Sequence, residues 1–108
     1  MNPNSETGEL PPLIPSQRSR QTLFDPGRIV STPGALDAVS AIEMAQALAR
    51  HLSGDWGELD HEDILANNHA LVHGGRLFSA YTTADKTRFW IITEADRSIT
   101  TVLRPAEY

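Results

Sequence analysis

The segment GGRLFSAYTTADKTRFWIITEADRSITTVLRPAEY, residues 74–108, decides the fold of this chain. Within it, residues 77–82, 88–94 and 99–104 are rich in β-branched and aromatic side chains, which favour strands. The polar residues 83–86 and 95–98 between them are typical of turns. The segment therefore predicts three consecutive strands that pair as an antiparallel meander.

The residues before the meander predict one strand and a helical region. A strand interrupted at Asp25-Pro26-Gly27 is expected over residues 22–30. Two to three helices are predicted to follow from their N-terminal signals, which are Thr32-Pro33, the capping box Ser40-x-x-Glu43, and Asp60. The sequence thus predicts an α+β domain in which an N-terminal strand and the meander belong to one sheet packed on helices.

Apolar positions at helical spacing predict which helical side chains are buried. These are Ala35, Leu36, Val39, Ile42, Ala45, Leu48, Ala49, Leu52, Ile64, Leu65, Leu71 and Val72. Arg50 and His51 are expected to be cations at a helix C-terminus. In the meander, one sheet face is expected to bury Leu77, Tyr81, Phe89, Ile91, Val102 and Leu103 against the helices. Phe78, Trp90 and Ile92 have the opposite parity, so a second layer or a second subunit is expected to cover them, and a homodimer is one possibility.

Length and composition predict one small domain, residues 22–108, preceded by a disordered arm, residues 1–21, that contains four prolines. The 108 residues include no cysteine, which excludes disulfides, thiolate nucleophiles and Cys-ligated metals. No apolar run is long enough to cross a bilayer, and Met1 is followed by polar, acidic and proline-rich residues. We therefore expect no membrane partner and a cytoplasmic location.

The formal net charge of −5 bears on possible partners. An acidic domain is repelled by phosphate backbones unless its few arginines are gathered on one face. Direct nucleic-acid binding is therefore not favoured, and a protein partner with a basic surface is expected.

Six residues around the start of the third helix form the candidate partner-binding segment: Asp55, Trp56, Glu58, Asp60, Glu62 and Asp63. The carboxylates make a negative patch that suits a basic protein surface, with Trp56 as an anchor. Two plainer interpretations stay open. Acids in the first turn of a helix stabilise its dipole, and a tryptophan on a glycine-rich loop commonly folds back over the core.

Other chemistry has less support in the sequence. His69 and His73 are four residues apart on the predicted third helix, and His61 lies two turns earlier, but no third ligand is specified, so no metal or cofactor is predicted. No Gly-x-Ser-x-Gly elbow and no phosphate-binding Gly-x-x-x-x-Gly-Lys loop is present. Arginines on one sheet face near Tyr108 could hold a phosphate and act on RNA, although strand-end arginines usually only protect sheet edges.

The order strand, helical pair, antiparallel meander resembles the RelE/ParE toxin superfamily, with residues 89–94 and 99–104 similar to its central and last strands. That resemblance implies a ribonuclease acting on messenger RNA at the ribosome, with Arg88, Arg104 and Tyr108 as the candidate catalytic residues. Residues 104–108 stand where the family has Gly-His-Arg.

Residues 27–36, 49–51, 54–57 and 90–98 also resemble short proteins carried by bacterial plasmids and integrative elements. That resemblance implies a mobile-element accessory protein. From the charge and this resemblance we expect a non-enzymatic protein that binds a basic partner through its acidic segment, with an anti-defence or regulatory role. The RNA-cleaving toxin is the alternative.

Overall fold

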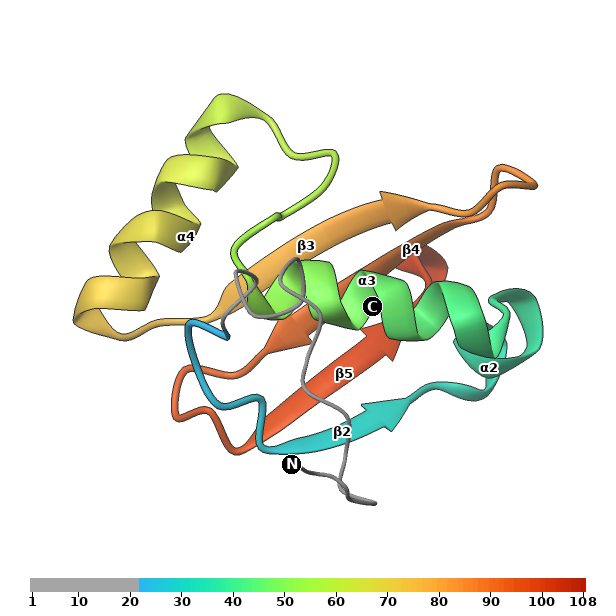
Figure 1. Cartoon of the computed structure of the whole chain (residues 1–108), viewed down its shortest axis with the longest axis horizontal. Coiled ribbons are helices and arrows are strands. Elements are labelled where there is room, and N and C mark those ends of the chain that lie inside the picture. Colours follow the sequence, from blue (N-terminus) through green and yellow to red (C-terminus); the bar gives the residue numbers. More distant parts are fainter. Residues whose placement is uncertain (1–21) are drawn as a thin grey trace, which may run out of the picture.

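A three-strand antiparallel unit at the C-terminal end joins a fourth strand from the start of the domain. The computed structural model describes residues 22–108, and the predicted arm lies outside them. Its elements are β2 (Arg28–Ser31), α2 (Pro33–Ala38), α3 (Ala41–Leu52), α4 (His61–His73), β3 (Leu77–Thr82), β4 (Arg88–Thr93), β5 (Ile99–Leu103) and the short 3₁₀ turn η1 (Pro105–Glu107) (Figure 1). The predicted α+β class is confirmed. None of the helices within residues 22–108 is long and apolar enough to span a membrane.

The sheet is mixed rather than a purely antiparallel three-stranded meander, with strand order β2-β5-β4-β3. β3, β4 and β5 pair antiparallel as neighbours, and β2 pairs parallel with β5. β2 is also shorter than predicted. Residues 22–27 lie outside the sheet, because Phe24 packs on the rings of His51 and Trp56 instead of pairing with a strand. Gly27 makes the turn into β2 at φ +66°, where an added Cβ would lie 2.3 Å from the Ser98 carbonyl oxygen.

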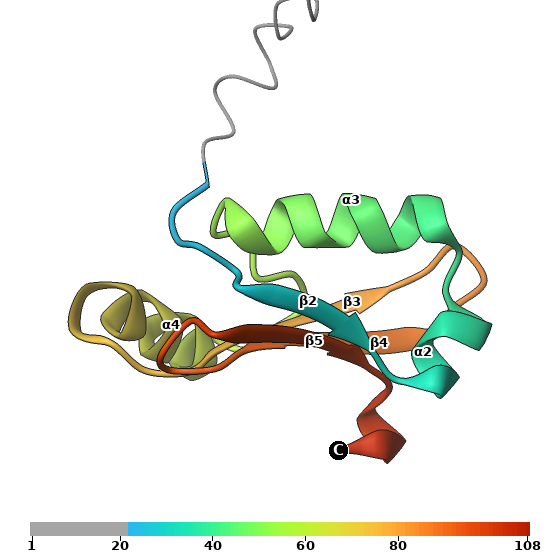
Figure 2. The ribbon, with the colours of Figure 1, turned by 90° about the horizontal axis from the view of Figure 1, so that it is seen from below.

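The helices cover the two faces of the sheet unequally (Figure 2). α3 lies across one face, where Tyr81, Phe89, Ile91 and Val102 pack with Ala47 in the main core. α4 lies beside β3 at the edge of the sheet (Figures 1 and 2). Apart from η1 at one end, no described element covers the other face, which we call the open face (Figure 2).

The N-cap predictions are confirmed. Thr32, Ser40 and Asp60 accept hydrogen bonds from the amides of Ala35, Glu43 and Asp63, respectively. Each cap satisfies an N–H group that the first turn of a helix leaves without a partner. The sequence therefore located all three helix starts correctly.

The predicted buried stripes of the helices are partly wrong. Six of the predicted residues are exposed. Four are large, at 64% for Leu36, 71% for Ile42, 52% for Leu65 and 77% for Val72, and the other two are Ala45 and Ala49. The faces that are buried instead carry small or polar side chains, which are Ala47 and His51 on α3 and Asn67 and Ala70 on α4. Apolar spacing missed them, because alanine lets a helix approach the sheet closely and paired polar groups are tolerated in a core.

Leu103 is also placed differently from the prediction. It pairs with Trp90, whereas Val102 pairs with Ile91 in the core. Successive residues of a strand point to opposite faces, so Leu103 belongs to the open face, where it is 5% exposed.

The outer edge of β3 is capped from within the chain. The backbone of residues 56–58 pairs with Ala80, and the side-chain amide of Asn67 donates to the Phe78 carbonyl and accepts from its N–H, at 2.7 and 3.0 Å. Asn67 thus replaces a strand partner, which explains a buried asparagine in the middle of α4.

Candidate functional site

The open face is a regular grid, because strand pairing aligns its residues in rows across the sheet. Two central rows are mostly apolar, and both end rows carry arginine. In the order β2, β5, β4, β3, the first row is Arg28, Ile99, Glu94 and Arg76. The second row is Val30, Thr101, Ile92 and Phe78, and the third is Thr32, Leu103, Trp90 and Ala80. The last row consists of Arg88 on β4 and Thr82 on β3. The two end rows are six positions apart along a strand. At about 3.3 Å per residue, the distance between them is roughly 20 Å.

A hollow of about 280 Å³ lies on this face, lined by Arg76, Phe78, Trp90, Ile92 and Tyr108. We call it the aromatic groove. Phe78 meets Trp90 edge-on with ring centroids 5.0 Å apart, and Tyr108 lies at 5.7 Å from Trp90 on the other side. Phe78 and Trp90 are half-buried and Tyr108 is 69% exposed. Three rings thus line one shallow apolar hollow that opens to solvent.

The charges of the open face are opposite in sign to those of the whole chain. Arg28, Arg76 and Arg88 are exposed on it, and Glu94 is the carboxylate in the same rows. Glu94 Oε1 lies 3.5 Å from Arg76 Nε. The chain as a whole has a formal charge of −5, so the strand arginines are segregated onto the face that α3 leaves uncovered.

The residues after β5 close one side of the aromatic groove. Arg76 Nη1 donates to the phenol oxygen of Tyr108 at 2.6 Å, and this bond is the main cause that raises the pKa of Arg76 above its ordinary value. Glu107 anchors η1 by accepting from the Thr32 hydroxyl at 2.6 Å and from the Gly34 amide at 3.1 Å. Together these bonds hold Tyr108 beside Trp90.

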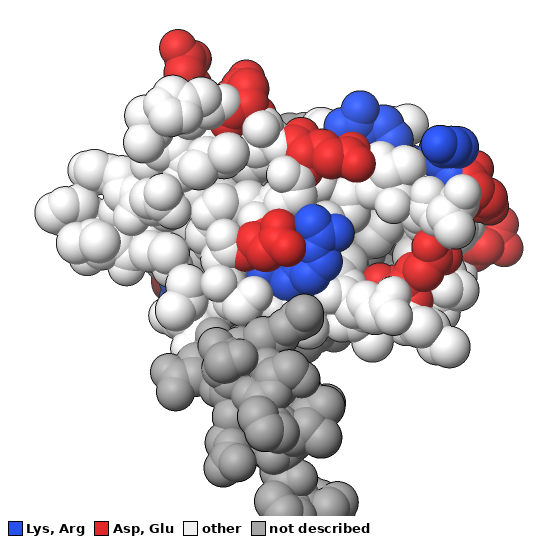
Figure 3. Space-filling view, turned by 45° about the horizontal axis from the view of Figure 1, so that its top comes forward, with Lys and Arg blue, Asp and Glu red and all other residues white. Residues whose placement is uncertain are grey.

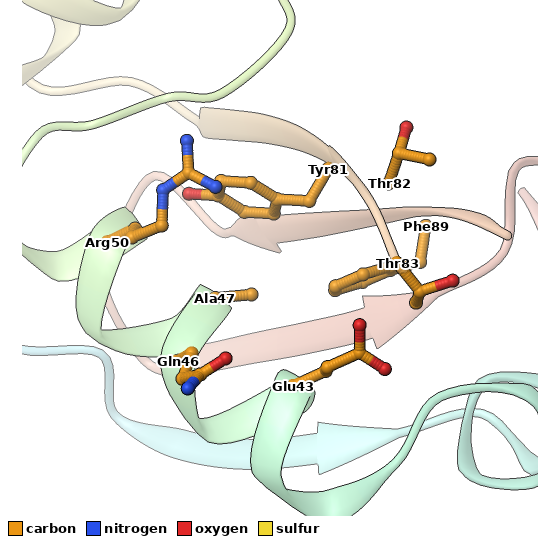
Figure 4. A pocket seen from close by; sticks show the side chains of 8 residues that line it. All are labelled: Glu43, Gln46, Ala47, Arg50, Tyr81, Thr82, Thr83 and Phe89. Atoms are coloured by element: carbon orange, nitrogen blue, oxygen red, sulfur yellow. The ribbon is translucent and has the colours of Figure 1, made fainter. Parts of the chain in front are cut away.

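A second hollow, of about 110 Å³, lies on the helix-covered side between α3 and the β3–β4 hairpin (Figure 4). Arg50 lies over the Tyr81 ring at 4.7 Å and forms an ion pair with Asp55 at 2.7 Å. Glu43 accepts from the Ala84 amide at 2.8 Å. The polar groups of this small hollow are thus engaged with one another and with backbone, and it is less suited to a ligand than the aromatic groove.

The structure gives most of the predicted acidic segment a partner within the chain. Asp55 pairs with Arg50, Glu58 accepts from the Thr82 hydroxyl at 2.8 Å, and Asp60 caps α4. Glu62 and Asp63 lie exposed in the first turn of α4. Figure 3 shows acidic side chains in several separate patches on this side of the molecule, one of them directly against basic side chains.

Trp56 is buried, at 5% exposed, so its indole is not at the surface as the predicted anchor. It stacks on Phe24 with ring centroids 6.4 Å apart and meets the His51 ring edge-on at 5.6 Å. The plainer interpretation of this tryptophan, as a plug over the core, describes its position.

The candidate RNA-cleaving residues lie on or beside the open face but are not joined. Arg88 begins β4, Arg104 precedes η1, and Tyr108 follows it. Among residues 22–108, no hydrogen bond connects any two of these three side chains. The exposed rings of His69 and His73 on α4 are tilted to each other, with centroids 4.4 Å apart. No group of three or more potential metal ligands occurs among the described residues.

A buried histidine, which the sequence predicted as a cation at a helix C-terminus, is the centre of a polar network. His51 is 0% exposed, and its ring nitrogens lie 2.5 Å from Ser79 Oγ and 2.9 Å from Thr93 Oγ1. Thr93 and Thr100 hydroxyls are 2.7 Å apart, and Thr100 donates to the Pro26 carbonyl at 2.7 Å. Because Thr100 donates to Pro26, the direction of the other hydrogen bonds follows. Thr93 donates to Thr100, His51 Nε2–H donates to Thr93, and Ser79 donates to His51 Nδ1.

Burial keeps His51 neutral. Burial, with a smaller contribution from the positive charge of Arg97, lowers the pKa of His51 to about 4. The sequence did contain a signal: Ser79, Thr93 and Thr100 have the core-facing parity of their strands, which calls for a polar partner inside.

Comparison of the chain with protein-family models, with curated proteins and with solved structures finds no match.

Proposed function

We propose that this protein binds single-stranded nucleic acid on the open face of its sheet, without catalysing a reaction. The observation that carries the proposal is the grid: a central aromatic and apolar area with arginines at both ends. Proteins that bind single strands combine exposed rings, on which bases stack, with cations that follow the phosphate backbone. Phe78 and Trp90 would contact bases, and Arg28, Arg76 and Arg88 would contact phosphates.

The proposal reverses the expectation drawn from net charge. That expectation had one condition, that the arginines are not gathered on a single face. Strand alternation and register gather Arg28, Arg76 and Arg88 on the open face, and the acidic residues 58–63 belong to α4 and the loop before it. Because screening limits charge effects to about 10 Å at 0.1 M salt, the local balance matters more than the total for a bound strand.

The test is the binding of labelled oligonucleotides measured by fluorescence anisotropy. Oligouridine RNA and oligothymidine DNA of about 12 nucleotides are the two probes, with a duplex of similar length for comparison. Replacing Trp90 with leucine, which keeps an apolar side chain, is expected to weaken single-strand binding by about tenfold or more. Trp90→Phe keeps a ring and is expected to bind like the original protein.

Arg50 provides a matched control for Arg76. Both arginines pair with a carboxylate and lie over a tyrosine ring, and their side chains are 44% and 48% exposed, but Arg50 is on the helix-covered side. Arg76→Gln is expected to weaken binding and to reduce its salt dependence by roughly the contribution of one phosphate contact, whereas Arg50→Gln has neither effect. Equal binding of duplex and single strand, or insensitivity to Trp90→Leu, would contradict the proposal. Cleavage of the RNA would favour the RNA-cleaving alternative.

A second candidate function is the binding of a basic protein partner by the acidic segment. The observation that favours it is that Asp60, Glu62 and Asp63 are all exposed at the start of α4, beside the sheet (Figure 1). The double variant Glu62→Lys with Asp63→Lys is expected to abolish capture of such a partner from a host lysate. The control is Asp37→Lys on α2, which also replaces an acidic residue with lysine. The buried Trp56 stays unchanged in this test. A partner retained by the double variant would contradict this candidate.

A further inference from the structure

Arg76 is the arginine that lines the aromatic groove, and two of its three nitrogens face partners within the chain. Its Nη1 donates to the Tyr108 hydroxyl at 2.6 Å, and its Nε faces Glu94 at 3.5 Å. The guanidinium carbon also lies 5.8 Å from the centroid of the Tyr108 ring. A phosphate that takes Arg76 Nη1 as a donor must therefore replace the hydrogen bond that Tyr108 now makes.

Tyr108 occupies the groove as a ligand ring would. Its ring meets Trp90 edge-on at an interplanar angle of 67°, while 69% of the residue remains exposed. The preceding turn is fixed separately, through Glu107 to Thr32 and Gly34 at the start of α2. Tyr108 can therefore leave the groove by rotation about its own bonds, with η1 still in place.

We propose that Tyr108 is an autoinhibitory side chain: its ring and hydroxyl occupy the base-stacking surface of Trp90 and the phosphate donor of Arg76, and a bound strand displaces them. This inference rests on the proposed nucleic-acid binding and adds its regulation. It gives Tyr108 the opposite effect on affinity from Phe78 and Trp90. Loss of a stacking ring weakens binding, whereas loss of a competing ring strengthens it.

The test compares two substitutions of Tyr108 in the same anisotropy assay with the oligouridine and oligothymidine probes. Tyr108→Phe removes the hydrogen bond to Arg76 and keeps the ring, and is expected to strengthen binding by about three- to tenfold. Tyr108→Ala also uncovers Trp90 and is expected to bind at least as tightly as Tyr108→Phe. Circular dichroism of each variant checks that the domain remains folded.

A double-mutant cycle identifies the residue through which Tyr108 acts. In an Arg76→Gln background, Tyr108→Phe is expected to lose its strengthening effect, because there is no guanidinium to release. A change elsewhere in the fold would not produce this coupling. The Glu107→Ala variant, which frees η1 from α2, is expected to strengthen binding in the same direction as Tyr108→Ala.

The outcomes separate this inference from the function on which it rests. Weaker binding by Tyr108→Ala would show that Tyr108 is a stacking platform, which overturns the inference and leaves the proposed function standing. Unchanged affinity in both Tyr108 variants would overturn it as well. If neither the original protein nor any Tyr108 variant binds either probe, the proposed function itself fails. Binding by Tyr108→Ala alone would support complete autoinhibition.

Discussion

Replacing His51 with alanine is expected to lower the free energy of unfolding by about 3–5 kcal/mol. The side chain is 0% exposed, so its removal leaves a cavity between α3 and the sheet. It also removes the hydrogen-bond partner of Ser79 and the donor to Thr93, both of which are fully buried. Urea denaturation followed by circular dichroism measures the change.

Ile42 provides the control on the same helix. It is 71% exposed, and Ile42→Ala is expected to change stability by less than about 0.5 kcal/mol. The sequence alone predicts the reverse order, because it placed Ile42 in the buried stripe and made His51 a cation at the helix C-terminus. A larger loss for Ile42→Ala than for His51→Ala would therefore contradict the structure.

Acid is expected to destabilise the domain through the same residue, by about 2 kcal/mol between pH 7 and pH 5. The pKa of His51 falls from 6.5 to about 4 on folding, because burial opposes the charged form. Between these two values the unfolded chain binds the proton more readily than the folded one. Above pH 6.5, His51 therefore does not lower the free energy of unfolding. As the pH falls towards 4, the free energy of unfolding decreases.

The measurement is a series of urea denaturations across this pH range, for the original protein and for His51→Gln. The glutamine variant is expected to be less stable at pH 7 but to lose less stability on acidification. The reason is that position 51 then carries no side chain that titrates in this pH range. Equal losses in the two proteins would show that His51 is not the cause of the acid sensitivity.

The His51 network and the open face occupy opposite sides of the same strands. Ser79 lies between Phe78 and Ala80, Thr93 lies between Ile92 and Glu94, and Thr100 precedes Thr101. The hydroxyls that hold His51 therefore fix the backbone directly behind the aromatic groove. We interpret the network as the rigid support of the proposed binding surface, because a platform for stacking needs rings at fixed positions.

The local features of this protein can be predicted from its sequence. Thr32, Ser40 and Asp60 mark the helix starts, and the alternation of Phe78, Trp90 and Ile92 against Leu77, Phe89 and Ile91 marks two apolar sheet faces. These signals are readable because capping and strand alternation act over a few residues.

Which of those features lie together on one face depends on the tertiary structure. Pairing of β2 with β5 brings Arg28 into the rows of Arg76 and Arg88, although Arg28 and Arg76 are 48 positions apart in the sequence. The same packing buries His51 and Trp56 and leaves Trp90 facing solvent beside Tyr108. Local pattern cannot supply this information, because the face that a residue joins depends on strand register and on which surface α3 covers.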